Sequence, residues 1–146
     1  YKVFAAIKKS LNVGKTGEAA FKPNATGSYF NALDSHNDTF KLLEEAINSV
    51  GVNTPDRKYL SIGVNADLGR YYLPEQQKYD LEGPKNLLDQ NMVIDWIFKL
   101  ANDHPLLTYI EDPLVQEIRG YQKLLKKFEG HHCKIAIKDW FGSDFA

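Results

Sequence analysis

Residues 106–113 read LLTYIEDP, a short apolar run that ends in two adjacent carboxylates and a proline. Apolar segments of similar length occupy residues 59–65 and 133–138, and the segments between them repeat apolar residues at helical spacing. Short apolar strands that alternate with longer amphipathic helices are typical of an α/β fold built on a parallel sheet. We therefore predict the order strand, helix, strand, helix, strand from residue 59 onward.

Apolar periodicity also predicts where the helices lie. They are expected over residues 1–11, 35–50, 84–102 and 114–128, with a glycine- and proline-containing loop over residues 13–28. Ser35 is a candidate N-cap because Asp38 follows it three residues later, and Gly51 is the predicted stop of that helix. Pro84 suits the first turn of the third helix.

The helical spacing predicts which side chains the last two helices bury. The third helix carries its apolar residues at Leu88, Met92, Trp96 and Leu100, and the fourth at Leu114, Ile118, Tyr121, Leu125 and Phe128.

The predicted strands end at Asn65, Glu111 and Lys138. In parallel α/β folds, functional sites gather at the carboxyl ends of the strands. Side chains alternate along a strand, so residues two positions apart share a face. The more polar face is expected to hold the site, and its residues are Ser61, Gly63 and Asn65, then Leu107, Tyr109 and Glu111, then Lys134, Ala136 and Lys138.

Composition narrows the class of protein. Of the residues, 43% are hydrophobic and 25% are charged, and the formal net charge is −1. That balance argues against nucleic acid or a membrane surface as a partner, because such proteins usually carry a basic excess. The single cysteine, Cys133, rules out an internal disulfide and fits a cytoplasmic setting.

Several segments resemble the enolase family in order and spacing. IGVNA at 62–66 resembles the enolase strand I-G-M-D-V, KYDL at 78–81 matches K-Y-D-L, and YIEDP at 109–113 resembles S-I-E-D-P-F. NDHP at 102–105 resembles the helix end K-D-Y-P, and GEAAFKPN at 17–24 resembles the loop G-D-E-G-G-F-A-P-N.

The resemblance implies a fold. Residues 1–146 would be an internal fragment of the enolase C-terminal barrel domain, the central portion of a (β/α)8 barrel that is incomplete in this chain. An N-terminal lid domain and the rest of the barrel would lie outside it.

The resemblance also implies a glycolytic lyase activity, that of phosphopyruvate hydratase. Enolases interconvert 2-phosphoglycerate and phosphoenolpyruvate, with Mg²⁺ ions stabilising an enolate-like intermediate. Glu111 matches the glutamate ligand of the metal, whereas Asn65 and Lys138 stand where the family has aspartate ligands. An ammonium cannot ligate a cation, so we expect a degraded Mg²⁺ site in which the Lys138 amine pairs with Glu111.

Other site residues follow from the same resemblance. Asp67 and Asp139 are candidate replacement ligands, the second if a one-residue bulge shifts the strand. Glu18 matches the catalytic glutamate that helps remove the hydroxyl as water. The family's catalytic lysines would lie beyond Ala146.

Three functions stay open. The chain belongs either to an active Mg²⁺-dependent enolase or to an inactive enolase-like protein, a pseudoenzyme with a structural or interaction role. Asparagine at position 65 resembles the divergent paralogues of animal sperm, which makes a flagellar or cytoskeletal setting an alternative to a general cytoplasmic one. Another acid-sugar member of the wider superfamily is the third reading. In each enolase reading we expect a homodimer or a larger protein assembly.

Overall fold

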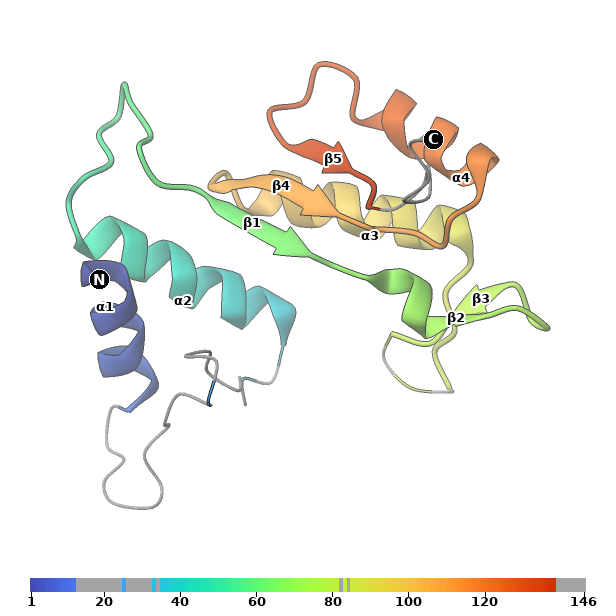
Figure 1. Ribbon diagram of the computed structural model, residues 1–146, viewed down its shortest axis with the longest axis horizontal. Coiled ribbons are helices and arrows are strands. Elements are labelled where there is room, and N and C mark those ends of the chain that lie inside the picture. The colour runs from blue at the N-terminus through green and yellow to red at the C-terminus, as the bar shows by residue number, and fades with distance from the viewer. Residues whose placement is uncertain (13–24, 26–32, 34, 82, 84, 139–146) are drawn as a thin grey trace, which may run out of the picture. The chain divides into compact units, whose positions relative to one another are not determined.

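The computed structural model describes residues 1–12, 25, 33, 35–81, 83 and 85–138. The chain divides into two compact units, Tyr1–Ser61 and Ile62–Ala146, which are described separately. Figure 1 shows the elements of each. Pro84 and nearly all of the predicted loop at 13–28, including Glu18, lie outside the described residues.

The first unit contains two helices, α1 (Lys2–Leu11) and α2 (His36–Ser49), which pack against each other. The predicted start of α2 is confirmed, because the Ser35 hydroxyl oxygen accepts a hydrogen bond of 3.1 Å from the Asp38 backbone N–H. The predicted stop is confirmed as well: Gly51 has a φ of 71°, a left-handed conformation that glycine adopts at little cost.

The second unit is built on a parallel sheet of order β1-β4-β5, with β1 at Ile62–Asn65, β4 at Leu107–Glu111 and β5 at Lys134–Ala136 (Figure 1). The predicted parallel pairing is therefore confirmed. β4 lies between its two neighbours, and its Leu107 and Ile110 side chains are 0% and 2% exposed. A central strand buried in this way reads as an apolar run.

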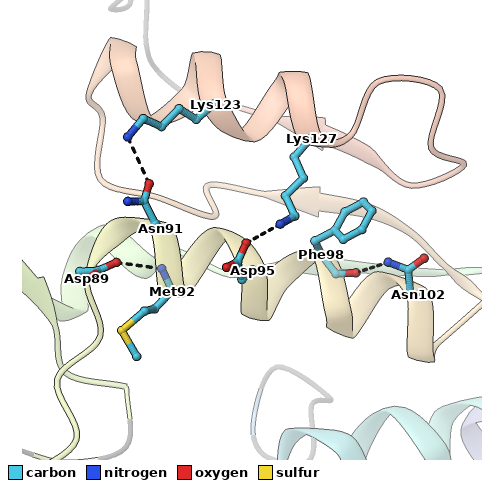
Figure 2. Close-up of polar contacts among 8 residues, drawn as sticks. All are labelled: Asp89, Asn91, Met92, Asp95, Phe98, Asn102, Lys123 and Lys127. Atoms are coloured by element: carbon cyan, nitrogen blue, oxygen red, sulfur yellow. Dashed lines mark hydrogen bonds and ion pairs between the residues drawn. The ribbon is translucent and has the colours of Figure 1, made fainter.

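Helices α3 (Gln90–Asp103) and α4 (Ile118–Lys127) connect these strands. Figure 2 shows two polar links between them: Lys123 Nζ lies 3.1 Å from Asn91 Oδ1, and Lys127 forms an ion pair with Asp95. Partner positions rise by four residues on both helices, so α3 and α4 run parallel, as consecutive helices of a βαβ series do.

The predicted start and buried stripe of α3 were wrong. The helix begins at Gln90, where the Asp89 side chain accepts a 2.9 Å hydrogen bond from the Met92 backbone N–H (Figure 2). Leu88 is extended instead, because its backbone exchanges hydrogen bonds of 2.8 and 3.0 Å with Tyr79. The side chains that α3 buries are Val93, Ile94, Ile97 and Ala101.

The predicted stripe of α4 was right only in part. Of the predicted residues, Tyr121 and Phe128 are buried, but Ile118 and Leu125 are 61% and 49% exposed, and the unpredicted Leu124 is buried in place of Leu125. The helix also starts later than predicted, because the Glu117 carboxylate accepts from the backbone N–H groups of residues 119 and 120 and caps the helix there. Leu114 is buried in the segment before the helix.

After β1 the chain forms the 3-10 helix η2 (Leu68–Tyr71) and an antiparallel pair, β2 (Tyr72–Leu73) and β3 (Lys78–Tyr79). Tyr79, within the KYDL segment, is fully buried, and its hydroxyl accepts a 3.1 Å hydrogen bond from the Val115 backbone N–H. That segment therefore holds β3 to the chain that follows β4. Among the described helices, none has the length and apolar character needed to cross a membrane.

Candidate functional site

The candidate site lies at the carboxyl ends of the parallel strands. Asn65 on β1 and Glu111 on β4 are paired neighbours, and Glu111 is paired in turn with Ala136 on β5. Because paired residues of adjacent strands share a face, Asn65 and Glu111 lie side by side. We call this surface of the sheet the open face; the opposite, apolar face carries Val64, Ile110 and Ile135 in register.

One residue expected on the open face belongs elsewhere. The pairing of β1 with β4 shifts between Ile62 and Gly63, so that Leu107 is the partner of Ile62. Leu107 is fully buried. A bulge of this kind breaks the simple alternation on which the prediction rested.

Lys138 lies two residues beyond the end of β5. Its backbone N–H donates a 2.8 Å hydrogen bond to Asp112 Oδ1, and its carbonyl accepts a 3.0 Å bond from Gln116 Nε2. In the described part of the chain, Lys138 forms no ion pair with Glu111. The expected Lys138–Glu111 ion pair is therefore not present among the described residues, and a different side chain is hydrogen-bonded to the Glu111 carboxylate.

That side chain is Tyr109, two residues before Glu111 on the same face of β4. The Tyr109 hydroxyl donates a 2.8 Å hydrogen bond to Glu111 Oε2. This bond raises the pKa of the Tyr109 phenol above its ordinary value, because the carboxylate stabilises the protonated hydroxyl. Residue-pattern reasoning placed Tyr109 on the polar face but gave it no role.

The Tyr109 ring is accommodated by the glycine opposite it. Gly63 is its partner on β1, and a Cβ atom on Gly63 would lie 3.5 Å from Tyr109 Cδ1. The ring thus lies in van der Waals range of the β1 backbone at a position where the sequence has no side chain.

Asp112, the second carboxylate of the pair, joins the three strand ends. Its backbone N–H donates to the Ala136 carbonyl and its carbonyl accepts from the Leu68 N–H, both at 3.0 Å, while its Oδ1 accepts from Lys138. Its φ is 49°, a left-handed conformation that Asp tolerates better than most residues but that is unusual before proline. Asp112 therefore has a structural role, which sequence reasoning missed.

Of the two predicted replacement ligands, Asp67 lies among the described residues and Asp139 does not. Asp67 has a φ of 44° and forms an ion pair with Arg70 at the start of η2. Asp139 and Glu18 lie outside the described residues, so their roles stay predictions.

These residues do not fit a Mg²⁺ site of the expected kind. Mg²⁺ requires hard oxygen ligands in near-octahedral geometry and releases its water reluctantly. On the open face, among residues 62–81 and 107–138, Glu111 is the one carboxylate at a strand end; Asn65 offers a neutral amide and Lys138 a cation. No group of three histidine, cysteine, aspartate or glutamate side chains that could hold a metal ion occurs in the described residues.

Two comparisons with known proteins agree with one another. A family profile described as "Enolase, C-terminal TIM barrel domain" matches residues 1–143. Enolase 2 of Lactobacillus johnsonii is 26% identical over 127 residues, which cover 86% of this chain and 27% of the relative. The chain therefore spans about a quarter of the length of that relative.

Proposed function

Because this chain belongs to the enolase family, we propose that it is the barrel portion of an enolase-like protein that does not catalyse the family reaction. One observation supports the proposal above the others. The Glu111 carboxylate, at the family's ligand position, accepts a hydrogen bond from Tyr109, and its neighbour across the strands is the uncharged Asn65.

The chemistry of the family reaction explains why these changes matter. A proton next to a carboxylate is removed only if cations absorb the charge that develops in the transition state. Divalent ions are held by several carboxylates because each contributes negative charge as well as an oxygen. An amide at position 65 and an ammonium at position 138 together remove two of those charges and add a positive one.

The role we propose is that of a structural or interaction component, acting as a homodimer or within a larger protein assembly in the cytoplasm. Asparagine at position 65 supports a relationship to the sperm-type enolase-like paralogues. Neither comparison bears on a flagellar location, which stays a prediction.

The second candidate is an active Mg²⁺-dependent enolase that acts on 2-phosphoglycerate. Glu111 favours it, since the ligand glutamate is retained at the end of β4. In that case Asp139 would be the missing ligand, because Asp67 is engaged by Arg70.

The deciding experiment is an assay of phosphoenolpyruvate formation from 2-phosphoglycerate by the full-length protein, with and without Mg²⁺. Enolase 2 of Lactobacillus johnsonii is the positive control, and circular dichroism with a cooperative melting curve shows that the protein is folded. We expect no Mg²⁺-dependent turnover. Turnover that disappears on chelation of the metal would overturn the proposal in favour of the active enzyme.

A further inference from the structure

We infer that the Tyr109 hydroxyl has taken the place of a cation on Glu111, so that the chain's own tyrosine closes this strand end to divalent metals. The inference deepens the proposed function and rests on it. It differs from the loss of ligands at positions 65 and 138, because it assigns an active blocking role to a side chain that is present.

The first support is the hydrogen bond itself. Tyr109 and Glu111 are two residues apart on one strand and therefore point to the same face, and the hydroxyl lies 2.8 Å from Glu111 Oε2. A metal that used both carboxylate oxygens would have to displace the hydroxyl. A metal that used only Oε1 would leave this hydrogen bond on Oε2 in place, and the Tyr109→Phe variant below tests whether the hydroxyl matters in that case.

The second support is that Glu111 forms no ion pair with a cationic side chain in the described residues. Its strand partners are Asn65 and Ala136, which carry no charge. Lys134 is the strand partner of Tyr109, but its ammonium lies 3.5 Å from the His131 carbonyl. The nearby Lys138 is tied through its backbone to Asp112 and Gln116. The Tyr109 hydroxyl is thus the side-chain donor bonded to Glu111 Oε2.

The third support is the space that the ring occupies. The Tyr109 side chain is 39% exposed in this chain and passes over Gly63, where a Cβ atom would meet it at 3.5 Å. A ring in this position, two residue pairs below Asn65 and Glu111, fills part of the open face on which a metal and its water shell would lie. A serine, which the resembling motif S-I-E-D-P-F carries there, would leave that volume free.

The test measures Mn²⁺ binding to the full-length protein by electron paramagnetic resonance, with Mn²⁺ as the probe for Mg²⁺. The variant Asn65→Asp/Lys138→Asp supplies the two missing carboxylates. It is compared with the same variant carrying Tyr109→Ser, which removes ring and hydroxyl, and with one carrying Tyr109→Phe, which removes the hydroxyl alone.

We expect the Tyr109→Ser triple variant to bind Mn²⁺ about 10-fold more tightly than the double variant, because freeing the carboxylate from one hydrogen bond of about 1.4 kcal/mol changes the affinity by that factor. A gain in the Tyr109→Phe triple variant as well assigns the block to the hydroxyl. A gain with serine alone assigns it to the ring. Equal affinity in all three variants would overturn the inference.

A crystal structure of the wild-type protein grown with millimolar Mn²⁺ provides a test that needs no variant to fold. We expect the Tyr109–Glu111 hydrogen bond and no Mn²⁺ on Glu111; a Mn²⁺ ion bound to Glu111 would refute the blocking role. Different results would refute the proposed function and the role of Tyr109. Wild-type turnover refutes the proposed function, whereas an inactive wild type together with equal Mn²⁺ affinities refutes only the role of Tyr109.

Discussion

The two faces of the β1-β4-β5 sheet differ in what they require of the sequence. On the apolar face, Val64, Ile110 and Ile135 align across the strands, and any set of apolar side chains of suitable volume serves there. On the open face, Asn65 lies beside Glu111. An amide at position 65 differs from an aspartate carboxylate in one atom group and one negative charge, and we propose that this difference changes what the site can bind. Under the proposed function, exchanges on the open face remove metal ligands, whereas exchanges on the apolar face change packing.

The largest expected effect on stability comes from the apolar face. Ile110 is 2% exposed, so Ile110→Ala should lower the free energy of unfolding of the full-length protein by about 2–5 kcal/mol. Chemical denaturation followed by circular dichroism measures the loss. Lys134→Ala, at an exposed position that pairs with Tyr109 on the open face, is the matched control. Equal losses from the two variants would show that the apolar face contributes no more to stability than the open face does.

Cys133, just before β5, reports on the same apolar side. Burial raises the pKa of its thiol to about 11, and the residue is 1% exposed. Because the thiolate is the reactive form, alkylation at pH 8 should be about 100-fold slower in the folded than in the unfolded protein, and it should accelerate as the pH rises toward that pKa. Peptide mapping by mass spectrometry measures modification of Cys133 alone. Similar rates in both states would show that this side of the sheet opens readily.

Asp112 lies where the two faces meet, so its loss should have an intermediate effect. Asp112→Ala removes the acceptor of the Lys138 N–H and places alanine at a φ of 49°, which should cost about 1–3 kcal/mol. Asp112→Asn keeps an oxygen acceptor and tolerates the left-handed conformation, so it should cost less. Thermal unfolding of both variants compares them, and an equal loss would assign the effect to charge rather than to the hydrogen bond and backbone.

The smallest effect is expected at the outer surface, between α3 and α4. The Lys127 and Asp95 side chains are 35% and 68% exposed, and an ion pair of this kind contributes about 0.2–1 kcal/mol. A double-mutant cycle with Lys127→Met and Asp95→Asn measures the coupling energy, which should decrease with added salt. A coupling energy well above this range would mean that the helices depend on charge as well as on apolar packing.

The sequence was sufficient to predict the parallel strands, their order along the chain and the cap at Ser35, since these follow from local periodicity and local hydrogen bonding. It was insufficient where distant segments interact. The start of α3 depends on the backbone pairing of Tyr79 with Leu88, and the burial of Leu107 depends on the shifted register near Ile62. The sequence permits the hydrogen bond between Tyr109 and Glu111, because an aromatic residue two positions before a carboxylate on a strand lies on the same face. The same spacing also occurs between residues that do not interact, so the spacing alone does not predict the bond.

The links between α3 and α4 also match one particular alignment of the two helices along their length. If α4 moved by one turn toward the carboxyl end of α3, Lys123 would face Asp95 and Lys127 would face Lys99. The hydrogen bond between Lys123 and Asn91 would then be lost, and Lys127 and Lys99 would repel each other. If it moved by one turn the other way, Lys127 would face Asn91 and its ion pair with Asp95 would be lost. Each link contributes little energy, but the alignment that the structure shows is the one in which both links form.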